Sequence, residues 1–292
     1  MRSWVFLLCW LAVGCGRGPF FQPPEQLEST RCGAVDFLFV IDNSESMQRH
    51  QDNLVMSFDP FVRGIRSSLD DVDDFHLGVV TTDAYRSNPM GCRDVGALVT
   101  SVDNGPWREV TECGPFAEGE RYMTQEDDLS KTFACAANVG TDGNREEEPM
   151  RAMRRALLGG PNGELHQCNG DFIRDNALLM TVIITDEGDG IPDGEDDEQD
   201  RSGSPSEWFR AVTNKKGAES NAVVLSLING VTPECPVDDP AFDGSRIAEF
   251  TNMFTHGFVG GICQPDYGAI FSRAVEEVDI ACDEWTRSAT ND

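Results

Sequence analysis

Two apolar runs constrain the fold of this chain more than any other feature. The first is FLFVI, at the end of a strand expected over residues 35–41, and the second is ALLMTVII, residues 177–184. Neither run alternates between polar and apolar residues, which is typical of strands buried on both faces of a parallel sheet covered by helices. The sequence therefore predicts an α/β fold.

Polar residues follow the first run at alternate positions. Asp42, Ser44 and Ser46 stand directly after the strand, in the stretch IDNSESM. Ligands of open α/β sheets bind just beyond the carboxyl ends of strands, and carboxylate and hydroxyl oxygens are donors suited to Mg²⁺ or Mn²⁺. The same residue types also form turns and cap helix N-termini. Both interpretations, a metal site and helix capping, are open at this point.

The Asp-x-Ser-x-Ser pattern resembles the metal-ion-dependent adhesion site of von Willebrand factor type A domains. The resemblance implies a Rossmann-like, doubly wound, mainly parallel sheet and two further ligands. Thr141, in NVGTDG before an expected helix, matches the threonine ligand, and Asp186, at the end of the second strand, matches the second aspartate. In the strand order 3-2-1-4-5-6, the strands that end at Asp42 and Asp186 flank the switch point of the sheet.

The resemblance also implies what such a site does. Mg²⁺ (or Mn²⁺) would be bound directly by Ser44, Ser46 and Thr141, with Asp42 and Asp186 acting mostly through water. A partner protein that presents Asp or Glu would complete the metal's shell. We therefore expect binding, in adhesion or assembly, and not catalysis.

The sequence departs from the family after Asp186, where Glu187, Gly188 and Asp189 stand in place of the frequent Asp-Gly. Extra carboxylates would tighten metal binding and weaken the attraction for an acidic ligand. They open the acidic run 186–200, DEGDGIPDGEDDEQD, which resembles the Ca²⁺-binding loops of thrombospondin type 3 repeats. The run is a single copy without EF-hand spacing, so a solvated acidic loop is favoured over a Ca²⁺ site.

The first residues resemble a bacterial lipoprotein signal. Arg2 is followed by the apolar stretch 4–13, and LAVGC places small residues before Cys15. The resemblance implies cleavage after residue 14, lipidation of Cys15, a tether over 15–30, and a bacterial cell-envelope location with the outer membrane favoured. An ordinary secretory signal or an uncleaved anchor is the alternative. The ten apolar residues are too few to span a bilayer, which needs about 20.

Eight cysteines remain after Cys9 and Cys15 of the signal. No CxxC pair is present, and an even number in an exported protein favours four disulfides over a zinc or redox site. Sequence cannot fix the pairing, but chain position suggests four pairs: Cys32 with Cys282, Cys92 with Cys113, Cys135 with Cys168, and Cys235 with Cys263.

The pattern of elements predicts one domain over residues 31–287 and a tail over 288–292. We expect strands at 35–41, 75–82, 177–186 and 222–228, and a short edge strand within 95–102. Helices are expected at 47–67, 125–137, from 146, and at 206–216, 247–255 and 267–282. Strands alternate with helices, so the sheet should be mainly parallel.

The net charge and the absence of known catalytic motifs restrict the classes of function that the sequence supports. With 51 acidic against 23 basic residues, the net charge of −28 disfavours nucleic-acid binding. No P-loop, GxSxG or HExxH motif is present, and the four histidines are scattered. A metal-dependent hydrolase is therefore disfavoured. The main alternative to a metal-dependent binding protein is a structural envelope lipoprotein with a degenerate metal site.

Overall fold

The computed structural model describes residues 32–68, 74–103, 109–143, 147–158, 163–189, 203–233, 235–237 and 242–289. The predicted signal peptide, Cys15, the tether and residues 290–292 lie outside these ranges. Residues 31–292 form one compact unit. No helix within the described ranges is long and apolar enough to cross a membrane.

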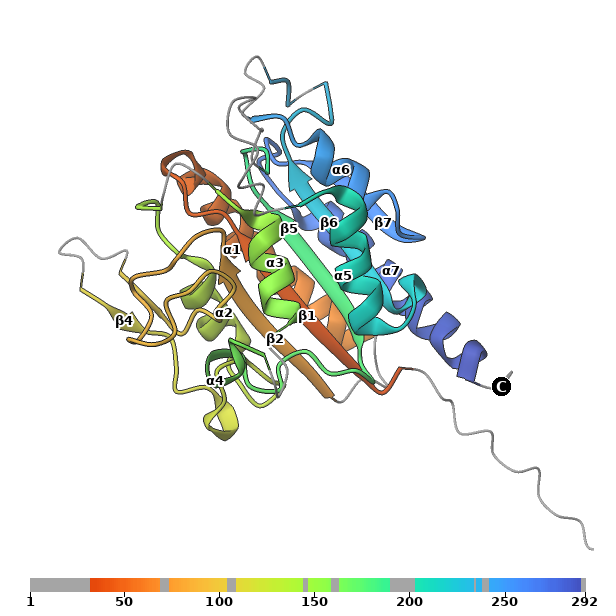
Figure 1. Cartoon of the computed structure of the whole chain (residues 1–292), viewed down its shortest axis with the longest axis horizontal. Helices are drawn as coiled ribbons and strands as arrows, with labels where there is room; N and C mark the ends of the chain where they lie inside the picture. Colours follow the sequence, from red (N-terminus) through yellow and green to blue (C-terminus); the bar gives the residue numbers. More distant parts are fainter. Residues whose placement is uncertain are drawn as a thin grey trace, which may run out of the picture. The chain divides into compact units, whose positions relative to one another are not determined.

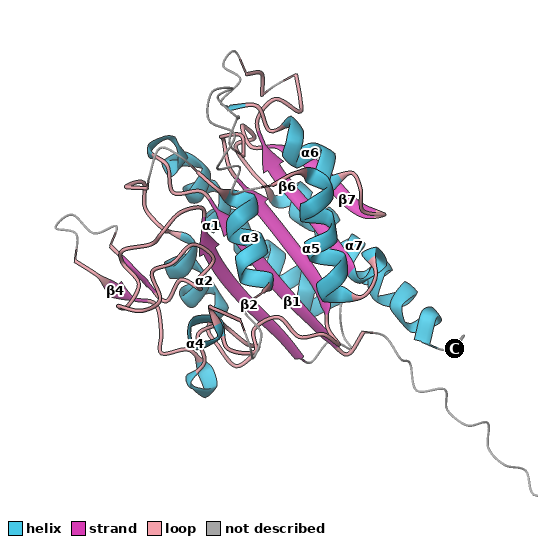
Figure 2. Ribbon diagram, in the orientation of Figure 1, coloured by secondary structure: helices cyan, strands magenta, loops and turns pink. Residues whose placement is uncertain are grey.

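A five-stranded parallel sheet forms the centre of this unit (Figure 2). Its strands are β1 (Ala34–Ile41), β2 (Asp74–Thr81), β5 (Leu178–Ile184), β6 (Ala222–Ile228) and β7 (His256–Gly261). Their order is β2-β1-β5-β6-β7, and every pair is parallel. The predicted α/β, doubly wound class is confirmed, and β1 and β5 are neighbours at the switch point.

Most of the short edge strand expected within 95–102 is replaced by irregular chain. Within 95–102 only β3 (Ser101–Val102) is a strand, and it pairs antiparallel with β4 (Thr111–Glu112) in a separate ribbon. Two separate backbone contacts cover the outer edge of β2 instead. The amide of Val99 donates to the carbonyl of Val79 at 2.8 Å, and Leu77 forms an antiparallel bridge with Met123. The predicted edge strand is thus wrong in extent, although the edge is covered.

Helices cover both faces of the sheet, as Figure 1 shows. One face packs against α1 (Gln48–Ser68), α2 (Leu129–Ala137) and α7 (Gly268–Ala289). The other packs against α3 (Pro149–Leu157), α5 (Pro205–Lys216) and α6 (Ser245–Thr251). The short helix α4 (His166–Asn169) and the 3₁₀ segments Glu45–Met47, Ala117–Gly119 and Glu219–Asn221 lie in connections.

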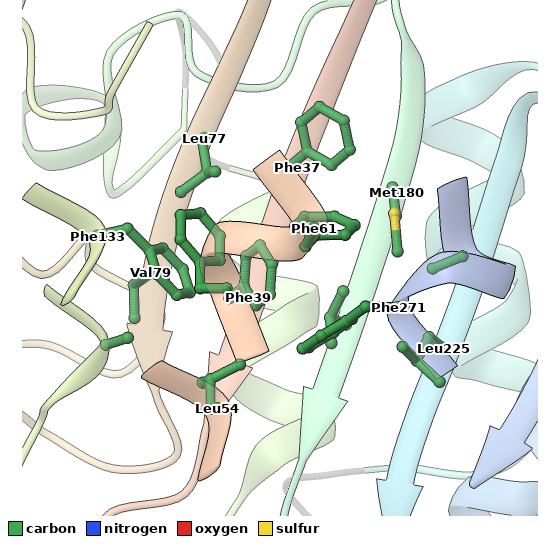
Figure 3. Close-up of a cluster of buried hydrophobic side chains, with 14 of the residues drawn as sticks. Phe37, Phe39, Leu54, Phe61, Leu77, Val79, Phe133, Met180, Leu225 and Phe271 are labelled. Atoms are coloured by element: carbon green, nitrogen blue, oxygen red, sulfur yellow. The ribbon is translucent and has the colours of Figure 1, made fainter. Parts of the chain in front are cut away.

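Alternate residues of β1 enter the two cores. Phe37 and Phe39 face the α1 side, where Phe39 meets Phe133 of α2 edge-on with ring centroids 4.8 Å apart (Figure 3). Leu38 and Val40 enter the core on the α3 side. Each fully buried side chain of this size contributes about 1.5–3 kcal/mol. The apolar run was predicted to be buried on both faces, and it is.

The described residues form four disulfides, and two of the suggested pairings are wrong. Cys32–Cys282 and Cys235–Cys263 form as suggested, but the other four cysteines pair as Cys92–Cys168 and Cys113–Cys135.

The correction has a structural cause. Asn169, next to Cys168 in α4, bonds through its side chain to the carbonyl of Gly96 and the amide of Leu98, which brings α4 to the loop that carries Cys92. Helix α2 packs against β3, which brings Cys135 to Cys113. Tertiary contacts between segments far apart in sequence therefore decide the pairing.

Candidate metal centre

The centre is built where β1 and β5 end side by side. Ile41 is paired with Ile184, and the amide of Asp42 continues the ladder by donating to the carbonyl of Ile184 at 3.0 Å. Because both strands are parallel and buried, the polar residues that follow them emerge at the same edge of the sheet. Asp42 and Asp186 therefore start from neighbouring backbone positions.

Three side-chain oxygens at this edge form a connected row. Ser44 Oγ and Ser46 Oγ are 3.2 Å apart, and Ser46 Oγ donates to Asp186 Oδ1 at 3.0 Å. Oxygens that occupy adjacent corners of an octahedral Mg²⁺ shell, at about 2.1 Å from the ion, are about 3 Å apart. The donor types and their spacing thus fit a hard divalent cation. Ser46 is exposed whereas Ser44 and Asp186 are buried, so the row opens to solvent at Ser46.

Asp42 is fully buried and holds the row in place. Its Oδ1 accepts from the amide of Ser44 at 2.7 Å, and its Oδ2 accepts from the hydroxyl of Thr185 at 2.6 Å. Burial raises the pKa of Asp42 to about 6, and these hydrogen bonds oppose the shift. Thr185 was not singled out from the sequence, although it is the first polar residue after the second apolar run.

Hydrogen bonds on both sides of Thr141 in the chain hold its loop against the end of β1. Gln51 Nε2 donates to the carbonyl of Asp42 at 3.0 Å and to that of Gly140 at 2.8 Å. The amide of Gly143 donates to the carbonyl of Asn43 at 2.8 Å, and a Cβ at Gly143 would lie 2.5 Å from that oxygen. Thr141, which is half-buried, is therefore held beside the Asp-x-Ser-x-Ser segment, and glycine is required where the two loops touch.

The additional acids after Asp186 have separate positions. Burial, followed by the charges of Asp42 and Asp186, raises the pKa of the half-buried Glu187 to about 7. Asp189 Oδ1 instead accepts from the amide of Met150 at 2.9 Å, in the first turn of α3, where a carboxylate is favourable. Asp189 thus bonds to a helix terminus.

Most of the predicted Ca²⁺ or solvated loop at 186–200 lies outside the described residues. One side chain contacts the described residues on either side of 190–202: Arg246 donates through Nη1 to the carbonyl of Asp189 at 2.9 Å and through Nη2 to that of Gly203 at 2.6 Å.

A second polar network lies behind the centre and was missed from the sequence. Glu147 is buried and hydrogen-bonds to the hydroxyl of Thr82, which also bonds to Asn43 Oδ1 at 3.2 Å. Asn43 Nδ2 in turn donates to Asp83 Oδ1 at 3.2 Å. Burial, and then the charge of Asp42, raises the pKa of Glu147 to about 9, so this acid is protonated at neutral pH. No pattern in the run of three glutamates, 146–148, distinguishes it from its neighbours.

Within the described part of the chain, no group of three or more His, Cys, Asp or Glu side chains is arranged to hold a metal ion. The candidate centre uses a different donor set, in which serine and threonine hydroxyls accompany two carboxylates.

Comparisons with known proteins give distant structural similarity only. A scan against protein-family models and a search of curated proteins each found no match. Among solved structures, the chain is similar to proximal thread matrix protein 1 from the mussel byssus, with a TM-score of 0.41 and 12% identity over 87% of this chain and 47% of that one. The chain spans about half the length of that protein.

It is also similar to the manganese-loaded TRAP protein of Plasmodium vivax, with a TM-score of 0.40 and 13% identity over 85% of this chain and 74% of that one. Similarity at this level does not identify a family. The α/β fold follows from the sheet topology described above.

Proposed function

We propose that this protein is a metal-dependent protein-binding domain of the von Willebrand factor A type. The observation that carries the proposal is the row Ser44 Oγ, Ser46 Oγ and Asp186 Oδ1, with separations of 3.2 and 3.0 Å, at the switch point between β1 and β5. These separations suit adjacent ligands of Mg²⁺ or Mn²⁺.

The residues have distinct parts in this proposal. Ser44, Ser46 and Thr141 would hold the ion, and Asp42 and Asp186 would orient bound water and the serines. When bound, the ion supplies a Lewis-acidic position that accepts a carboxylate oxygen from a partner protein. Solvent exposure of Ser46 leaves room for that carboxylate on the outer side of the row.

The sign of the charge explains why a metal is needed. A chain of net charge −28 repels an acidic partner, and a divalent cation offsets the negative charge of Asp42 and Asp186 locally. The partner is therefore expected to be a protein that presents Asp or Glu, and not a nucleic acid.

Location is the other part of the proposal. Lipidation of Cys15 would anchor the protein in a bacterial envelope, with the outer membrane favoured, and residues 15–30 would space the domain from the bilayer.

One observation favours the alternative, a structural lipoprotein with a degenerate centre. Both oxygens of Asp42 already have protein donors, so the network is partly satisfied without an ion.

A pull-down from envelope extract separates the two functions. The partner should be recovered with Mg²⁺ and lost with EDTA, and Thr141→Ala should weaken partner recovery more than Mg²⁺ affinity. Thr213→Ala is a matched control, because among the described residues its hydroxyl bonds within α5, to the carbonyls of Phe209 and Arg210. Equal recovery with Mg²⁺, with EDTA and with the Thr141 variant would favour the structural function.

A further inference from the structure

One side chain, that of Gln51, joins the two loops that carry the proposed metal ligands. It lies in the first turn of α1, and 1% of its surface is exposed. Helical side chains point back towards the N-terminus of their helix, and α1 begins close behind the end of β1. Gln51 therefore reaches the strand end, where its Nε2 donates to the carbonyl of Asp42 at 3.0 Å and to that of Gly140 at 2.8 Å. The amide carries two hydrogens, one for each carbonyl.

The hydrogen-bond partners fix the orientation of the Gln51 amide. Both are carbonyl oxygens, which accept and cannot donate, so the nitrogen of the amide must face them. The other amide atom, Oε1, is buried and has no hydrogen-bond partner among the described residues. An unpaired buried oxygen destabilises a fold, so packing alone does not account for a glutamine at this position.

The two carbonyls determine where their neighbours in the chain lie. The Gly140 oxygen belongs to the same planar peptide group as the Cα of Thr141. In the same way, the Asp42 oxygen shares a plane with the Cα of Asn43, inside the Asp-x-Ser-x-Ser segment. Because one nitrogen bonds to both oxygens, it fixes the two peptide planes relative to each other. The distance from Thr141 to the segment therefore depends on Gln51.

Other hydrogen bonds hold the loop at its ends. The Tyr85 hydroxyl donates to the carbonyl of Val139 at 2.8 Å, and the amide of Gly143 donates to the carbonyl of Asn43 at 2.8 Å. These bonds lie two residues to either side of Thr141, whereas Gln51 contacts the residue directly before it.

We propose that Gln51 is a positioning residue of the metal centre, which holds Thr141 at the distance from the two serines that a shared cation requires. The inference rests on the proposed function, since it treats the Thr141 hydroxyl as a ligand. Mg²⁺ demands near-ideal octahedral geometry, so a displaced ligand is poorly tolerated. Groups that orient metal ligands change metal affinity about 10- to 100-fold.

The first test needs no metal. In the purified protein in EDTA, NMR should show that the side-chain amide hydrogens of Gln51 exchange with solvent at least about 10-fold more slowly than those of Gln48. Gln48 is the internal control, because its amide bonds to Asp52 on the exposed surface of α1. Equal exchange rates would show that the Gln51 amide is not held between the two carbonyls. That result would overturn the inference and leave the proposed function standing.

The second test is calorimetric titration of variants with Mg²⁺. Gln51→Met removes both amide hydrogens without adding charge, and its Mg²⁺ affinity should fall about 10-fold while circular dichroism shows a folded protein. Gln51→Asn is a milder change that should lower the affinity too, because its amide is one methylene short of reaching both carbonyls. Gln48→Met, the matched control, should bind as wild type does.

Two results of this titration would count against different claims. Wild-type affinity in folded Gln51→Met and Gln51→Asn would overturn this inference alone. A wild-type protein that binds no Mg²⁺ would overturn the proposed function and the inference with it.

A double variant separates positioning of Thr141 from a general structural effect. If Gln51 acts through Thr141, the combination of Gln51→Met with Thr141→Ala should bind Mg²⁺ as weakly as Thr141→Ala alone, and no more weakly. A purely structural role would instead make the two losses of affinity multiply. Multiplied losses in the folded double variant would overturn the inference.

Discussion

Asp42 and Glu147 are both buried near the same strand ends, yet their partners give them different protonation states. Asp42 accepts from a backbone amide and a hydroxyl, which stabilise its charged form, whereas within the described part of the chain the Glu147 side chain bonds to one hydroxyl, that of Thr82. The pKa is raised to about 6 for Asp42 and to about 9 for Glu147. At neutral pH Asp42 is therefore available to a cation, and Glu147 is a neutral structural acid.

Thr185→Val should destabilise the protein, because it removes the 2.6 Å donor of Asp42 Oδ2. A buried carboxylate oxygen left unpaired costs about 1–3 kcal/mol, which urea denaturation in EDTA would measure. Thr181→Val on the same strand is the matched control. The Thr181 hydroxyl is buried, and none of the described residues hydrogen-bonds to it. Thr181→Val should leave the free energy of unfolding unchanged or raise it. Equal losses of this free energy in the two variants would contradict the role given to Thr185.

Glu147 should make stability depend on pH. Between the ordinary pKa of 4.5 and the raised value of about 9, the folded protein holds a proton that the unfolded chain releases. The free energy of unfolding should therefore fall as pH rises through this range, by up to about 1.4 kcal/mol per pH unit from this group. Glu147→Gln remains neutral and should flatten the slope in EDTA. Identical slopes for wild type and variant would show that Glu147 is ionised in the folded protein.

The sequence predicts which residues lie at strand ends, but it does not predict most of their hydrogen-bond partners. Asp42, Ser44 and Asp186 follow apolar runs, and this placement alone predicts that they share one sheet edge. Gln51 and Glu147 carry no such signal, since their importance comes from loops that meet only in the folded chain.

At the scale of elements, strands were predictable where burial is continuous. Residues 222–228 were expected as a strand, and β6 has these bounds. Strand β7, HGFVGG, was missed because it has three glycines and only two large apolar residues. The helix expected at 247–255 ends at Thr251, and the chain turns directly into β7. An edge strand has one neighbour, so its sequence is less constrained than that of a central strand.

Two disulfides that close loops of very different length allow a test of how crosslinks stabilise this fold. Cys32–Cys282 joins residues 250 apart, and Cys113–Cys135 joins residues 22 apart. In the chain-entropy account, removing them costs about 5 and about 3 kcal/mol, because the longer loop restricts the unfolded chain more. Replacing each pair by serine and measuring urea unfolding should give that order. A larger loss from the Cys113 pair would show that local packing around β4 and α2 dominates.

At the scale of the whole molecule, the sheet gives the centre its rigidity. Helices on both faces bury β1 and β5, so the residues at their ends are fixed by two cores and not by the loops alone. Figure 1 shows both strands within this layered arrangement. Function is thus expected at one edge of a domain whose remaining surface is strongly acidic.

The most direct test of this account is calorimetric titration of the purified protein with Mg²⁺. Wild type should bind one ion, and Ser44→Ala combined with Ser46→Ala should weaken binding by at least about 10-fold while circular dichroism shows an unchanged fold. Ser245→Ala, a serine at the start of α6, should bind as wild type does. Undiminished Mg²⁺ affinity in the folded double variant, or no binding by wild type, would contradict a metal centre at the ends of β1 and β5.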